Sequence, residues 1–118
     1  MPSKVEAKAM PRLLLVEDDI DVRSTMEQML GDAGYEVETA QTVIVANELL
    51  GHGEFDLVVT DGRLPDGHGL RIAMLAREAG IPALIVTAYP FGVPLEWPVL
   101  QKPFRAGELI AAAKKVIG

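Results

Sequence analysis

Acidic, hydroxyl and lysine side chains stand at the ends of short apolar runs at four places in this 118-residue chain. They are Glu17 with Asp18, then Asp61, Thr87 and Lys102. Carboxylates gathered at one point repel one another unless a cation lies between them, and their hard oxygen atoms select Mg²⁺ or Mn²⁺. A lysine and a hydroxyl across such a site would bind the oxygens of a phosphoryl group. The residue types therefore indicate metal-assisted phosphoryl transfer.

Each of these residues has an ordinary structural explanation when it is taken alone. An acidic run such as residues 17–19 is more often the start of a helix, and Asp61 can simply cap the helix that follows it. A lone threonine at Thr87 is usually a strand hydroxyl, and a lone Lys102 usually points into solvent. Because all four places lie at predicted strand ends, the combination favours one shared site.

Five apolar or alternating segments predict the strands that hold these side chains. They are residues 12–16, 35–40, 55–60, 82–87 and 97–101. Apolar residues at spacings of three and four predict helices at residues 22–33, 42–50, 70–79 and 105–117, and Asp19 or Asp21 would cap the first. Strands that alternate with helices form a parallel sheet. We therefore expect a flavodoxin-like, doubly wound α/β fold with five parallel strands in the order 2-1-3-4-5.

The stretch between Thr87 and Lys102 interrupts this alternation. It has fourteen residues, and they include Pro90, Gly92, Pro94 and Pro98. Each proline removes a backbone donor and clashes with the preceding turn of a helix. We therefore expect residues 88–96 to form a loop in place of the fourth helix.

Composition narrows the class of partner. The formal net charge of −6 and the pI near 4.8 argue against direct binding to nucleic acid or to an anionic membrane, since both need clustered lysine and arginine. No apolar run reaches the roughly 18 to 20 residues of a membrane span, and no cysteine is present. We expect a cytoplasmic protein with a flexible extension at residues 1–10 and one domain at residues 11–118.

Four motifs resemble the receiver domain of two-component response regulators. They are residues 14–19 (LLVEDD), Asp61 followed by Leu64-Pro65 and Gly69, residues 86–88 (VTA), and residues 102–104 (KPF). The resemblance extends over residues 11–118. It implies that a phosphoryl group passes from the phosphohistidine of a sensor histidine kinase to a carboxylate of this chain.

The resemblance also implies a role for each residue of the site. Asp61 would be the phosphoacceptor, and Asp18, Asp61 and the backbone carbonyl of Arg63 would hold Mg²⁺ or Mn²⁺ while Glu17 assists through water. Lys102 would pair with the carboxylate and then with the phosphoryl group. Thr87 would be the switch hydroxyl that moves to the phosphoryl group.

Two features depart from the usual receiver pattern. The helix before the last strand has no room, and Val99 stands three residues before the lysine, where receivers usually have Tyr or Phe. A subgroup of receivers that lack this helix, many of them linked to HWE-type histidine kinases, has an ending similar to residues 98–104. Its Phe-Ala-Thr-Gly-Tyr stretch is echoed in part by residues 85–89.

The departures suggest how the switch would work. We expect residues 88–96 to be a mobile loop that phosphorylation orders, with Tyr89 and Phe91 packing where the helix would lie. Alternatively, the two rings cover the core beneath a permanently ordered loop. Arg63 and Tyr89 would flank the path of the attacking water and tune the lifetime of the phosphoryl group.

The function expected from all of this is a phosphoaccepting signalling switch, not an enzyme, that regulates a downstream protein partner. One alternative is a receiver-like interaction module that works without phosphorylation. Another is a small phosphatase with an aspartyl-phosphate intermediate, but such enzymes usually carry a second acid where this chain has Arg63. No output domain follows the last helix, so we expect a protein that acts alone or a part of a longer one.

Overall fold

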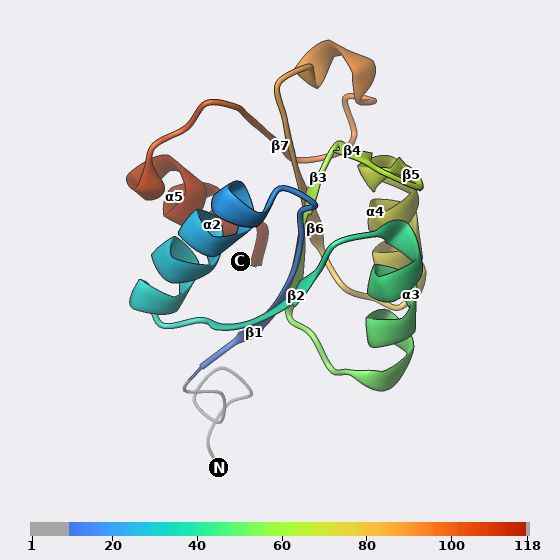
Figure 1. Cartoon of the computed structure of the whole chain (residues 1–118), viewed down its shortest axis with the longest axis horizontal. Coiled ribbons are helices and arrows are strands. Elements are labelled where there is room, and N and C mark those ends of the chain that lie inside the picture. The colour runs from blue at the N-terminus through green and yellow to red at the C-terminus, as the bar shows by residue number, and fades with distance from the viewer. Residues whose placement is uncertain (1–9, 118) are drawn as a thin grey trace.

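A parallel five-stranded sheet is the centre of the computed structural model (Figure 1), which describes residues 10–117. Its strands are β1 (Arg12–Val16), β2 (Glu36–Ala40), β3 (Leu57–Asp61), β6 (Ala83–Thr87) and β7 (Val99–Gln101). They are arranged in the order β2-β1-β3-β6-β7. In strand-only numbering this is 2-1-3-4-5, so the predicted flavodoxin-like topology is confirmed. The predicted extension at residues 1–10 lies, except for Met10, outside the described residues.

Helices cover both faces of the sheet. They are α2 (Ile20–Asp32), α3 (Val43–His52), α4 (Gly69–Glu78) and α5 (Ala106–Ile117). Because successive residues of a strand point to opposite faces, Leu13 and Leu15 pack with α2 and α5, whereas Leu14 and Val16 pack with α3 and α4. This double covering explains why the central strands are almost continuously apolar. No helix within residues 10–117 combines the length and apolar character that crossing a bilayer requires.

The helix starts follow from local hydrogen bonding. Asp19 caps α2, because its carboxylate accepts hydrogen bonds from the backbone N–H groups of Asp21 and Val22 at 2.9 and 3.0 Å. Of the two capping residues predicted, Asp19 is the one used. Thr42 caps α3 in the same way, with its hydroxyl accepting from Val45 N–H at 3.1 Å.

The predicted element boundaries are mostly within two residues of the observed ones, and two short strands were not predicted. Two-residue strands β4 (Arg63–Leu64) and β5 (Gly67–His68) pair antiparallel and form the β4–β5 hairpin directly after β3. The final strand was predicted to begin at Trp97, but β7 begins at Val99. The reason is that the Trp97 N–H turns back to the carbonyl of Pro94, and Pro98 has no N–H to give to a ladder.

The structure has the predicted loop at the place where the alternation of strands and helices would put a fourth helix. The β6–β7 loop, residues 88–98, contains a single 3₁₀ turn, η1 (Pro90–Gly92), which stands away from the sheet in Figure 1. Tyr89 is 65% exposed and Phe91 is 99% exposed. The interpretation in which these two rings cover the core is therefore wrong for this structure. Trp97, which is buried, and the partly buried Val93 pack against the core instead.

Candidate functional site at the carboxyl ends of the strands

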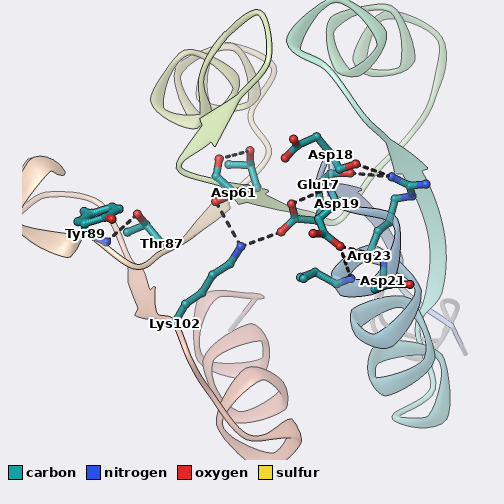
Figure 2. A network of polar contacts seen from close by, with 11 residues as sticks. Glu17, Asp18, Asp19, Asp21, Arg23, Asp61, Thr87, Tyr89 and Lys102 are labelled. Carbon is teal, nitrogen blue, oxygen red and sulfur yellow. Dashed lines mark hydrogen bonds and ion pairs between the residues drawn. The ribbon is translucent and has the colours of Figure 1, made fainter.

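Three carboxylates meet where β1 and β3 end side by side. The strands are neighbours in register, with Val16 opposite Thr60, so the residues that follow them lie together. One oxygen each from Glu17, Asp18 and Asp61 lies within 4.8 Å of the other two (Figure 2). The parallel topology thus brings together acids that are more than forty positions apart in the sequence.

Lys102 reaches this acidic cluster from the end of β7. Its Nζ atom is 2.8 Å from Oε1 of Glu17 and 3.4 Å from Oδ1 of Asp61 (Figure 2). Its backbone N–H donates to the carbonyl of Thr87 at 2.9 Å, which joins the end of β7 to the end of β6. One ammonium therefore bridges two of the three acids, and the cluster keeps an excess of negative charge.

Burial and pairing act in opposite directions on the pKa values of Glu17 and Lys102. Glu17 is only 2% exposed, and burial raises the pKa of its carboxyl against the opposing effect of the hydrogen bond from Lys102. Burial by itself would lower the pKa of the Lys102 ammonium, but the hydrogen bond to Glu17 and the charge of Asp61 outweigh it and raise that pKa. The lysine therefore stays charged at neutral pH.

Arg23, a residue that the sequence did not single out, holds the turn between β1 and α2. Its Nη1 donates to the backbone carbonyl of Glu17 at 3.0 Å and to that of Asp18 at 3.4 Å (Figure 2). The Asp19 N–H donates to Oε2 of Glu17 at 3.2 Å. An arginine in the first turn of a helix usually points into solvent, so only the fold shows that this one returns to the acidic turn.

The turn after Asp61 is packed so closely that glycine is required. The Gly69 N–H donates to the carbonyl of Gly62 at 3.0 Å, and the Gly62 N–H donates to that of Val86 at 3.0 Å. A Cβ atom on Gly69 would overlap the carbonyl oxygen of Asp61. That same oxygen accepts a hydrogen bond from the Thr60 hydroxyl at 2.9 Å. The backbone around Asp61 is therefore fixed by these hydrogen bonds and by its close approach to Gly69.

Thr87 and Arg63 take part in the contacts between the segment after β6 and the segment after β3. Thr87 is buried, and its hydroxyl accepts a hydrogen bond from Tyr89 N–H at 3.0 Å (Figure 2). A Cβ atom on Gly62 would lie 2.9 Å from the Thr87 hydroxyl oxygen, so the two loops touch there. The Arg63 guanidinium stacks over the Tyr89 ring at 5.1 Å from its centroid. The two side chains thus lie against each other, and their place along the path of the attacking water stays a prediction.

The donor set fits a small divalent cation. Three carboxylates offer hard oxygens from one point, and a single lysine leaves their negative charge only partly balanced. Of the predicted metal residues, Glu17, Asp18 and Asp61 converge through their side chains. The Arg63 carbonyl belongs to the loop that directly follows Asp61.

Comparison with known proteins identifies the family. The model of the response regulator receiver domain matches residues 13–90, so this chain belongs to the receiver domains of two-component systems, which are phosphoaccepting signalling switches. Response regulator protein PilR of Pseudomonas aeruginosa is 39% identical over 80 residues, which are 66% of this chain and 18% of PilR. The chain thus spans less than a fifth of that relative.

Solved structures agree with this family over almost the whole chain. A response regulator receiver protein from Sinorhizobium medicae has a TM-score of 0.82 at 27% identity, and the match covers 94% of this chain and 96% of that one. The receiver domain of sensor histidine kinase PA1611 from Pseudomonas aeruginosa also has a TM-score of 0.82 at 27% identity, with 93% and 99% covered. That structure holds a magnesium ion in its active-site cleft.

Proposed function

We propose that residues 11–118 act as a receiver that takes a phosphoryl group from a sensor histidine kinase onto Asp61 and passes the signal to a downstream protein. The observation that supports this most directly is the position of the Asp61 carboxylate, beside Glu17 and Asp18 and 3.4 Å from the ammonium of Lys102. We expect Mg²⁺, or Mn²⁺ in its place, to be held by Asp18, Asp61 and the Arg63 carbonyl, with Glu17 assisting through water.

The transfer itself is a displacement at phosphorus. A carboxylate oxygen of Asp61 attacks the phosphorus of the kinase phosphohistidine, a P–O bond forms, and the P–N bond breaks. The imidazole leaves with the electron pair of that bond, and it leaves as a neutral ring because its other nitrogen carries a proton in the phosphohistidine. A bound divalent cation would neutralise the charge on the phosphoryl oxygens.

This chain's own residues do the positioning. Lys102 holds the Asp61 carboxylate before the transfer and a phosphoryl oxygen after it. Arg23 fixes the turn that carries Glu17 and Asp18. Thr87 then gives up its hydrogen bond with Tyr89 N–H and donates its hydroxyl to the phosphoryl group.

That exchange of partners at Thr87 would carry the signal outward. The Tyr89 N–H lies at the start of the β6–β7 loop, so losing its acceptor frees the loop to take another arrangement. We propose that phosphorylation orders this loop and that its rings, exposed here, then pack where other receivers have a helix. The net charge of −6 disfavours nucleic acid as the direct target, and HWE-type kinases are the expected donors.

Intact mass after incubation with acetyl phosphate and Mg²⁺ tests the proposal. The wild type should gain one phosphoryl group and Asp61→Asn should gain none. An equal adduct on both proteins would place the phosphoryl group elsewhere. No adduct from acetyl phosphate or from a cognate kinase would instead favour a phosphorylation-independent interaction module, for which the exposed Phe91 and Leu95 side chains would offer a surface.

A further inference from the structure

The β4–β5 hairpin is tied to α3 by one carboxylate. Asp66 lies in the turn of the hairpin, and its two oxygens accept hydrogen bonds from the N–H groups of Val43 at 2.7 Å and Ile44 at 3.1 Å. These two groups belong to the first turn of α3, twenty-three and twenty-two positions away in the sequence. They are donors that a helix cannot satisfy by itself.

The chemistry of this contact favours a charged aspartate. The positive end of the helix dipole and two backbone donors stabilise an anion at the start of α3. The hydrogen bond from Val43 accordingly lowers the pKa of the Asp66 carboxyl, with that from Ile44 contributing. Gly67 lies directly behind, where a Cβ atom would be 3.2 Å from Cγ2 of Val43. Polar and close apolar contacts thus join the turn of the hairpin to the same end of the helix.

The hairpin also connects directly to the acidic site. It begins at Arg63, two residues after Asp61, and it ends just before Gly69, whose N–H is bonded to the carbonyl of Gly62. The backbone of Arg63 therefore lies between two fixed points: the Gly62–Gly69 hydrogen bond on one side and the Asp66 contact on the other. Releasing the outer point would leave the Arg63 carbonyl held only by the Gly62–Gly69 hydrogen bond and by the pairing of Arg63 with His68 inside the hairpin, which would then be free to shift as a unit.

We propose that Asp66 is a positioning residue for the metal site: by fixing the β4–β5 hairpin to α3, it holds the Arg63 carbonyl where the cation is bound. This inference rests on the proposed function for the cation itself. It gives Asp66 a role beyond capping α3, since the cap alone would act only on the stability of the helix.

Thr42 provides the matched control. It caps the same helix end through its hydroxyl, which accepts from Val45 N–H, but it makes that bond within its own segment and not to the hairpin. Asp66→Ala and Thr42→Ala both remove an acceptor from the first turn of α3 and should both lower the urea midpoint of unfolding. Only Asp66→Ala also frees the hairpin.

The deciding measurements are Mg²⁺ affinity by calorimetry and amide exchange at Gly69 without Mg²⁺. Asp66→Ala should weaken Mg²⁺ binding about tenfold, as is typical when support for a metal ligand is lost, and should speed Gly69 exchange. Thr42→Ala should change neither. Asp66→Asn keeps one acceptor oxygen and should recover part of both effects.

Wild-type values of both quantities in Asp66→Ala would overturn the inference, and so would equal changes in Thr42→Ala. Asp66 is exposed, so its variants should fold and give an answer. If the wild type itself fails to bind Mg²⁺, the proposed cation fails. Gly69 exchange in the two variants would still decide whether Asp66 holds the hairpin.

Discussion

The loops that follow the neighbouring strands β3 and β6 meet at the site but are held very differently. After β3, the chain is fixed by the Gly62–Val86 and Gly62–Gly69 hydrogen bonds and by the Asp66 carboxylate on α3. After β6, the backbone N–H groups of Gly92, Val93 and Trp97 each donate to a carbonyl only three positions earlier. The tip of this second loop leaves Phe91 and Leu95 fully exposed.

We propose that this difference separates the phosphoryl chemistry, on the side of β3, from the signalling, on the side of β6. Asp61, the proposed acceptor, is the last residue of β3, and Arg63 lies in the firmly held segment that follows it, so their geometry would survive motion elsewhere. The β6–β7 loop is held at its far end, where Arg77 stacks on Trp97 at 3.8 Å and pairs with Glu96 at 3.2 Å. At its near end it touches the site through Thr87 and through the Arg63–Tyr89 stack. Between these ends Val93 packs against the core, whereas Phe91 and Leu95 face solvent.

The largest expected effect is a loss of stability when a glycine after β3 is replaced, compared with a glycine in the β6–β7 loop. Gly69→Ala would force a Cβ into the Asp61 carbonyl and should cost about 3 kcal/mol, whereas Gly92→Ala enters open space and should stay within about 0.5 kcal/mol. Urea unfolding measures both. A Gly69→Ala variant that does not fold would agree with the expected loss of stability. Similar urea midpoints for the two variants would contradict the proposed difference between the loops.

Amide exchange tests the contrast in mobility. The amides of Gly92 and Val93 should exchange faster than that of Gly69, and beryllium fluoride with Mg²⁺, which mimics the phosphoryl group, should slow them about tenfold. Asp61→Asn serves as the control, because the mimic has no acceptor there. Unchanged exchange in the β6–β7 loop of the wild type would refute phosphorylation-dependent ordering.

A smaller effect is expected where the two loops touch. Arg63→Ala removes the stack on Tyr89 and should speed dephosphorylation by about threefold, because water then reaches the site more easily. Mg²⁺ affinity should hardly change, since the backbone carbonyl of residue 63 remains. Tyr89→Ala should act in the same direction. Equal changes in dephosphorylation and in Mg²⁺ affinity would show that Arg63 works through the cation.

The smallest effect concerns pH and the firmly held loop. The pKa of Asp66 is lowered from its ordinary value of 3.8, so its contribution to stability is present above that value and is lost as the pH falls through the lowered pKa. The stability difference between wild type and Asp66→Asn should therefore be constant near neutral pH and shrink below about pH 4. Urea midpoints across this range measure it, and a difference that grew on acidification would exclude the charged cap.

Most of the site followed from the sequence because parallel topology does the assembling. Once strands alternate with helices, the residues that follow parallel strands must meet at one edge of the sheet, so the sequence alone predicts that Glu17, Asp61 and Lys102 lie together. Arg23 and Asp66 could not be found in this way. Each side chain bonds to backbone atoms, Arg23 as a donor and Asp66 as an acceptor. Every residue type has these backbone atoms, so the sequence does not indicate which ones a side chain will contact.

The exposed rings show another limit of sequence patterns. Periodicity identifies apolar residues that face a core, but the β6–β7 loop has no period, so nothing indicated whether Phe91 would be covered. The prolines correctly predicted that this segment forms a loop and not a full helix. In the structure, Trp97 is the aromatic side chain of this loop that packs against the core, and Phe91 is left in solvent.

The full exposure of Phe91 also makes the protein convenient to observe. The chain has no cysteine, so Phe91→Cys would introduce a unique thiol at the tip of η1. An environment-sensitive dye attached there would lie outside the packed core and away from the acidic cluster. Fluorescence from that position would report on the proposed switch in real time, with no radioactive phosphate and no partner protein.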